Sequence, residues 1–257
     1  MKVSENPTET PSDRIDWPAR AGAVAPWWHT GILVVIIVGV SALSAIHSKA
    51  VGLGASHIKR YALTIAWEWA LGLFVWWGLH MRRTPLREIL GLRRAGFREW
   101  ARDFGIALIF WIIAIVILAG IGLVLRLAHL LNSPKAVAAL APQTIPQALL
   151  WIILCCTAGV VEEFVFRGYL LQQFSSLGSA RGSRVSLWTG VLASSLLFGA
   201  AHGYEGIGAM IAITAYGAMF SGLAIYRRSL RAGMMAHAWH DSITGIAVAL
   251  ATHAHLF

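Results

Sequence analysis

Residues 148–171 are ALLWIILCCTAGVVEEFVFRGYLL, an apolar run whose only charged residues are Glu162, Glu163 and Arg167. The hydrocarbon core of a bilayer is about 30 Å thick, so about 20 helical residues cross it. The length and composition of this run therefore predict a membrane-spanning helix. Charged groups inside such a helix are costly and usually mark function.

The composition of the whole chain agrees with this prediction. Of its 257 residues, 57% are hydrophobic and only 13% are charged, whereas about a quarter are charged in soluble domains. These proportions exclude a disordered chain, a disulfide scaffold and an ordinary soluble enzyme. Seven stretches have the length and apolarity of membrane spans: 28–46, 61–81, 104–125, 148–171, 186–201, 208–226 and 232–251. We expect an all-α, polytopic helical bundle with about seven transmembrane helices (six to eight).

The chain divides into three regions along its length. Residues 1–26 are rich in Pro, Ser, Thr and acidic residues, which is typical of a flexible tail. Residues 27–140 contain N-terminal transmembrane helices and a basic interfacial segment, 82–103. Residues 141–257 contain the remaining spans and most of the unusual polar residues, so we expect the functional core there.

The charge distribution predicts the topology. The net charge is +9, but the cations lie in loops between apolar runs, which argues against a nucleic-acid partner. A cytoplasmic N-terminus places 15 Lys and Arg residues on the cytoplasmic side and 5 on the other. This asymmetry follows the positive-inside rule. We expect a multi-pass protein surrounded by membrane lipid, in the plasma (inner) membrane, with its N-terminus in the cytoplasm.

Helix geometry separates the two adjacent glutamates. Glu163 and Arg167 are four residues apart, in the order that favours an ion pair on one helix face. Glu162 lies about 100° around the helix and has no cation three or four residues later. Glu163 and Arg167 are therefore predicted to be a supporting pair, and Glu162 is free to act as a general base.

Further polar residues lie in the later spans. His202 follows the fifth span, and His237 and Asp241 share a face of the seventh. His240 is expected to be a neighbour of the site. Glu68, in the second span, either supports the site or is a packed, protonated carboxyl; we favour the second interpretation.

The order of these motifs resembles the CPBP family of intramembrane endopeptidases, which includes CAAX-processing, Ras-converting-enzyme-like proteases and bacteriocin-processing proteins. The motifs are EExxxR from Glu162 to Arg167, FxxxH ending at His202, and HxxxD from His237 to Asp241. The resemblance covers roughly residues 145–250. It implies hydrolysis of a peptide or protein substrate, with or without an attached lipid.

By that resemblance, Glu162 and His202 activate the attacking water, and His237 with Asp241 stabilises the oxyanion. Relatives often carry Asn at the last position. An aspartate can donate a hydrogen bond to an oxyanion only when it is protonated, so the role of Asp241 is open.

Three alternatives use the same residues. A zinc-dependent intramembrane protease would take His202, His237 and Asp241 as ligands. A proton-coupled transporter would use them as a proton relay. In a non-enzymatic immunity protein they would only form part of the folded core. No span offers the HExxH pattern that prearranges two zinc ligands on one helix. We therefore predict catalysis without a metal or another cofactor.

Overall fold

The computed structural model describes residues 22–50, 56–91, 96–130 and 140–254, and every element within these ranges is helical. The long helices are α1 (Trp27–Ala50), α2 (His57–Met81), α4 (Phe97–Leu127), α6 (Ile145–Glu162), α8 (Ser183–Ala201), α9 (Ile207–Arg227) and α10 (Arg231–His253). The short elements are α3 (Leu86–Leu90), the π-helix η2 (Glu163–Leu170), α7 (Leu171–Gly178), and the 3-10 turns η3 (Ser179–Arg181) and η4 (Gly203–Glu205). The predicted all-α fold class is confirmed.

Six of the helical segments in the described ranges are long and apolar enough to cross a membrane. They are Trp27–Ile46, His57–Met81, Phe97–Leu127, Ile145–Gly178, Ser183–Ala201 and Ile207–Arg227. The seventh long helix, α10, has 23 residues and carries the polar side chains expected near the site. Each of the seven predicted spans falls within one of these segments, and the protein is a multi-pass membrane protein.

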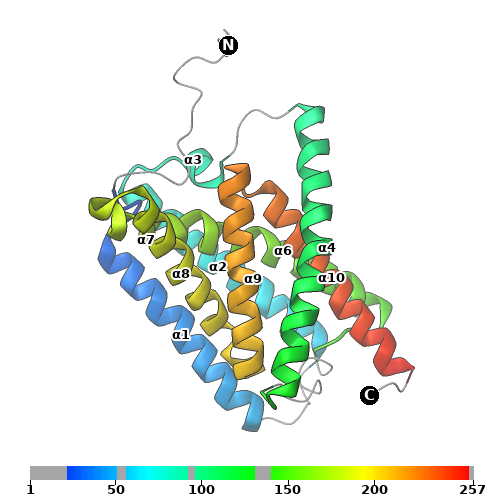
Figure 1. The fold of residues 1–257 in the computed structure, drawn as a ribbon. Coiled ribbons are helices and arrows are strands. Elements are labelled where there is room, and N and C mark those ends of the chain that lie inside the picture. The colour runs from blue at the N-terminus through cyan, green and yellow to red at the C-terminus, as the bar shows by residue number, and fades with distance from the viewer. Residues whose placement is uncertain (1–21, 51–55, 92–95, 131–139, 255–257) are drawn as a thin grey trace.

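The segment that decides the fold is one continuous helix. α6, η2 and α7 follow one another without a break over 34 residues, about 50 Å at 1.5 Å per residue. The segment is longer than the hydrocarbon core and crosses the bundle diagonally (Figure 1). At its start, the Thr144 hydroxyl accepts a hydrogen bond from the Gln147 backbone N–H at 3.4 Å. The segment ends at Gly178, which packs against Ser186 of α8.

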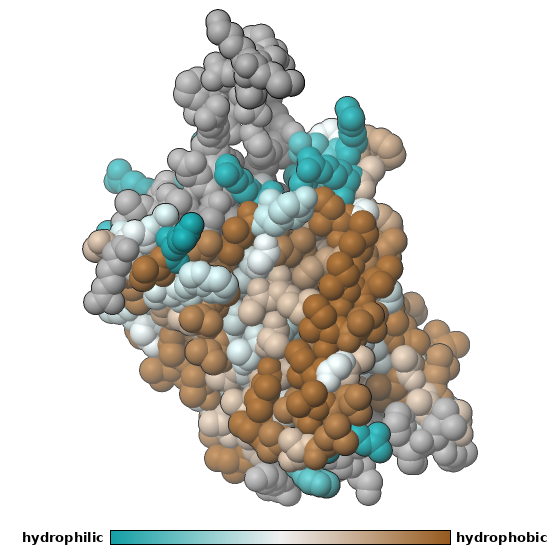
Figure 2. Space-filling model, in the orientation of Figure 1, coloured by the Kyte–Doolittle hydropathy of each residue, from teal (hydrophilic) through white to brown (hydrophobic). Residues whose placement is uncertain are grey.

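Three clusters of buried hydrophobic side chains hold the described helices together. α6 packs against both α2 and α10, while α4 packs against α9 and α10 (Figure 1). Only 11% of the most apolar stretch of α4 is buried, so most of this helix faces lipid. Figure 2 shows a broad apolar surface over α4 and hydrophilic residues gathered near its beginning. The cytoplasmic end proposed from the loop charges is this hydrophilic end.

The structure limits the predicted tail. Residues 1–21 lie outside the described ranges, but Val24 and Ala25 are fully buried. Both donate their backbone N–H groups to the Gln173 side chain, at 2.8 and 3.1 Å. A side chain from a distant helix thus holds the backbone just before α1, and the flexible tail predicted for residues 1–26 stays a prediction. The basic segment 82–103 comprises α3 and the first turns of α4, with 92–95 outside the described ranges.

Candidate active site

The charged residues of the long segment lie where its helix changes type. α6 ends at Glu162, and the π-helix begins at Glu163 and includes Arg167. All eight residues of the π-helix are buried. Gly168 allows the close packing, since a Cβ there would lie 2.9 Å from Ile89 Cγ2. π-helical turns are rare and are often found at functional sites.

Glu163 and Arg167 form a fully enclosed ion pair. Arg167 Nη1 lies 2.9 Å from Glu163 Oε1, and the two side chains are 1% and 0% exposed. The guanidinium also stacks over aromatic rings, with its carbon 4.1 Å from the ring centre of Phe198 and 5.1 Å from that of Phe220. Cation–π contacts compensate part of the lost hydration of an arginine. This pair is thus fixed by packing on several sides.

His237 connects the two glutamates. Its Nδ1 is hydrogen-bonded to Glu163 Oε1 at 3.1 Å. Its Nε2 lies 3.6 Å from Glu162 Oε2 and 3.5 Å from Asp241 Oδ2. Because a carboxylate only accepts hydrogen bonds, the Glu163 contact assigns the Nδ1 proton to the imidazole. The Phe220 ring stacks on the imidazole with ring centres 5.1 Å apart. The result is an oriented imidazole whose Nε2 faces two further acids.

The exposed fractions show from which side the cluster is accessible. His237 and Glu163 are almost completely buried, whereas the side chain of Glu162 is 15% exposed and that of Asp241 is 33% exposed. On α6, Trp151 donates its indole N–H to the backbone carbonyl of Asp241 at 3.2 Å. This bond holds the Asp241 turn against α6. Glu162 and Asp241 are therefore the acids of the cluster that remain partly exposed.

His202 stands at the end of α8. Its Nδ1 is hydrogen-bonded to the Phe198 backbone carbonyl of its own helix at 2.9 Å. A carbonyl only accepts, so Nδ1 carries a proton and Nε2 remains for water or substrate. The histidine within ion-pair distance of Glu162 in the described structure is His237, and not His202. His202 does lie within range of electrostatic interaction with Asp241.

Two polar residues near the site come from the N-terminal helices. Glu68 of α2 is 7% exposed, and its Oε2 has no hydrogen-bond partner. It interacts electrostatically with Glu162, His237 and Asp241, so it belongs to the surroundings of the site rather than to a separate apolar core. Ser41 of α1 contacts the backbone on both sides of His202. In the sequence, Glu68 stands out only as an acid within a predicted span. Nothing in the sequence distinguishes Ser41, because a single serine in a span is ordinary.

The predicted alternative zinc ligands are not grouped as a metal site. Within the part of the chain that the structure describes, no three His, Cys, Asp or Glu side chains are placed to hold one ion together. Of these three residues, His237 and Asp241 lie close together. The Nδ1 atom of His237 contacts Glu163, and its Nε2 atom faces Asp241. The prediction of catalysis without a metal stays a prediction.

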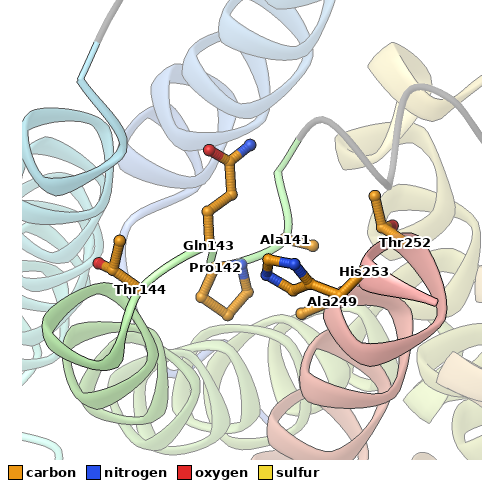
Figure 3. A pocket seen from close by; sticks show the side chains of 7 residues that line it. All are labelled: Ala141, Pro142, Gln143, Thr144, Ala249, Thr252 and His253. Carbon is orange, nitrogen blue, oxygen red and sulfur yellow. The ribbon is translucent and has the colours of Figure 1, made fainter. Parts of the chain in front are cut away.

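A separate pocket lies between the loop before α6 and the end of α10. No residue of the polar cluster lines it, and Figure 3 shows the Gln143 and His253 side chains among its walls. Its lining residues are Ala141, Pro142, Gln143, Thr144, Ala249, Thr252 and His253. The chemistry-bearing side chains therefore lie elsewhere.

Comparison with known proteins agrees with the motifs. Residues 144–243 match the family model of the Rce1-like type II CAAX prenyl endopeptidases. No curated protein and no solved structure matches the chain. The family match spans α6 to the middle of α10 and includes all of the predicted site residues. It confirms the resemblance and, with the apolar helices, supports an intramembrane protease that acts on a peptide or protein.

Proposed function

Given that residues 144–243 are Rce1-like, we propose that the protein hydrolyses peptide bonds of membrane-associated substrates with a water activated by Glu162 and His202. The observation that carries this proposal is the difference between the two adjacent acids. Glu163 is held by Arg167 and His237, whereas Glu162 has no cation of its own helix and retains 15% exposure. Glu162 is thus the acid of the pair that can meet a water molecule.

The attack on the substrate uses both accessible acceptors. Glu162 takes a proton from water, and His202 Nε2 accepts the other hydrogen bond of that water. The water oxygen forms a bond to the scissile carbonyl carbon, whose oxygen becomes negative. Glu162 then gives its proton to the leaving nitrogen, the C–N bond breaks, and an acid and an amine are released.

The negative oxygen needs hydrogen-bond donors. His237 can supply an Nε2–H when both of its ring nitrogens are protonated, because Glu163 already fixes the Nδ1 proton. Asp241 lies 3.5 Å from the same nitrogen and donates only in its protonated form. We therefore assign oxyanion stabilisation to His237, with Asp241 as its partner.

The surroundings define the substrate class. Because the cluster lies among membrane-spanning helices, the substrate is a membrane-associated peptide or protein. The segment around its scissile bond enters the site in an extended conformation. The family description names prenylated CAAX sequences, so a lipidated C-terminus is the first substrate to test. The charge asymmetry of the loops supports a cytoplasmic N-terminus, and we propose the plasma membrane as the location.

The direct test uses purified protein in liposomes. Wild type and Glu162→Gln are incubated with CAAX-type peptides that carry or lack a prenyl group, and products are identified by mass spectrometry. Glu162→Gln keeps the shape of the side chain but cannot accept a proton, so cleavage should fall by about 10²–10⁴-fold. The matched control is Glu99→Gln on α4, an acid that is 49% exposed and outside the site. Cleavage by Glu162→Gln at the wild-type rate would contradict the proposal, and substrate uptake without cleavage would favour a transporter.

A second test concerns the metal. If the carboxylate and imidazoles suffice, activity survives prolonged treatment with a strong chelator, and the active protein contains far less than one metal ion per chain. A catalytic zinc ion generally takes three protein ligands and supplies the activated water itself. Stoichiometric zinc that is lost and restored together with activity would establish the metalloprotease mechanism.

A further inference from the structure

The end of α8 depends on a hydroxyl group from another helix. The Ser41 side chain of α1 is 5% exposed. It donates to the Ala200 carbonyl at 2.7 Å and accepts from the Gly203 N–H at 3.1 Å. His202 lies between these two backbone groups in the sequence. One hydroxyl therefore holds the chain on both sides of the histidine.

This contact satisfies a need of the helix end. The last carbonyl groups of a helix have no partner within the helix, and unpaired backbone groups are costly where water is scarce. The His202 backbone is bonded locally, since its N–H donates to the Gly199 carbonyl at 3.1 Å. The neighbouring Ala200 carbonyl and Gly203 N–H are satisfied by Ser41 instead. Without the hydroxyl, both groups lose that partner and the turn that carries the histidine is less constrained.

α1 is itself fixed to the helix that carries Glu162. Thr30 Oγ1 lies 2.9 Å from the Tyr169 hydroxyl, in the π-helix that follows Glu162. Thr30 and Ser41 are 11 residues apart, about three turns and roughly 16 Å, so they share one face of α1. α1 therefore contacts the Glu162 helix near one end of this face and the His202 turn near the other.

We propose that Ser41 is a positioning residue for His202, and that α1 sets the distance between His202 and Glu162. This proposal rests on the proposed function, because it assumes that His202 acts on the water. The contributing helix lies before residue 144, outside the matched region. The N-terminal half of the chain would thus take part in catalysis without touching the substrate.

The test measures kcat and KM for Ser41→Ala in liposomes. A displacement of a catalytic group by about 1 Å can cost up to about 10²-fold, so kcat should fall by about 10- to 100-fold while KM changes little. Ser44→Ala is the matched control, since Ser44 is exposed on the same helix one turn later. Ser41→Thr restores the hydroxyl and should recover most of the rate. Wild-type kcat in Ser41→Ala would overturn the proposal.

A double substitution separates positioning from general stability. If Ser41 acts through His202, Ser41→Ala causes a much smaller loss in the His202→Ala background than in the wild type. Equal losses in both backgrounds would overturn the proposal. Should Ser41→Ala fail to fold, Gly203→Ala carries the test, because the added Cβ would lie 3.0 Å from Ser41 Oγ and displace it. A kcat of Gly203→Ala between that of the wild type and that of His202→Ala supports the proposal, and a wild-type kcat overturns it.

The two proposals fail in different ways. If Glu162→Gln or His202→Ala cleaves at the wild-type rate, the proposed function is wrong. If both are strongly impaired while Ser41→Ala is fully active, only the positioning role is wrong.

Discussion

The part of the chain that the structure describes buries two clusters of acids and arginines, and they differ in how completely their hydrogen bonds are made. The end cluster consists of Asp103 near the start of α4, Arg227 at the end of α9 and Arg231 at the start of α10. Asp103 is 0% exposed, and its two oxygens accept from Arg227 Nε at 2.8 Å and from Arg231 Nε at 2.6 Å. A second nitrogen of Arg227 also contacts Asp103 Oδ1. Both oxygens of this acid are therefore paired.

The site cluster consists of Glu162, Glu163, Arg167, His237 and Asp241. Its buried atoms include Glu162 Oε2, Glu163 Oε2 and Arg167 Nη2, none of which has a hydrogen-bond partner within the described protein. The Arg167–Glu163 contact is an ion pair at 2.9 Å rather than an aligned hydrogen bond. Unpaired buried polar atoms in a native protein require an explanation. Buried charge is thus common to both clusters, and the unmade hydrogen bonds distinguish the one that we expect to be catalytic.

The largest expected effect on stability comes from removing the cation of the site cluster. Arg167→Ala leaves the carboxylate of Glu163 buried without its arginine, and breaking a buried pair costs about 3–5 kcal/mol of folding free energy. Thermal unfolding in detergent micelles should show a large decrease in the melting temperature. Glu162→Gln is the control, because it keeps the shape of the side chain and leaves the Glu163–Arg167 pair intact, so it should unfold near the wild-type temperature. Equal melting temperatures for these two variants would show that the ion pair contributes nothing to stability.

A smaller effect is expected from the end cluster. Asp103→Asn keeps one oxygen acceptor and removes the charge, and losing a charged hydrogen bond costs about 1–3 kcal/mol. The arginines can also extend toward the headgroups at the membrane surface, which limits the loss. The same unfolding measurement checks this value, and peptide cleavage should continue at 25 °C. A loss as large as that of Arg167→Ala would erase the predicted difference between the two clusters.

The smallest expected effect tests the space around Glu163. A Cβ at Gly233 of α10 would lie 3.0 Å from Glu163 Oε2, whereas a Cβ at Gly222 of α9 would meet nothing within 4 Å. Alanine is favoured over glycine inside a helix by about 1 kcal/mol, so Gly222→Ala should stabilise slightly. Gly233→Ala should lose that gain and reduce cleavage, because the carboxylate must shift. Equal stability and equal cleavage for the two variants would show that the Glu163 side chain accommodates a methyl group at residue 233 without a change in function.

The sequence predicted the parts of this molecule that depend on local patterns. Apolar run length located the seven long helices, and four-residue spacing predicted that Glu163 and Arg167 would share a face. Spacing could not reveal that the helix continues as a π-helix after Glu162, because that change alters hydrogen bonding and not composition. It also could not reveal that Ser41 reaches the end of α8. Such contacts join residues far apart in the chain, and only the packed bundle decides them.

The contact between Gln173 and the start of α1 has a consequence for biosynthesis. Val24 precedes Gln173 by 149 residues. At a synthesis rate of 5–20 residues per second, roughly 7–30 s pass between the appearance of these two residues. During that interval the two backbone N–H groups that precede α1 lack the side chain that accepts from them in the folded protein. The backbone before α1 therefore makes these hydrogen bonds only after α7 has been made.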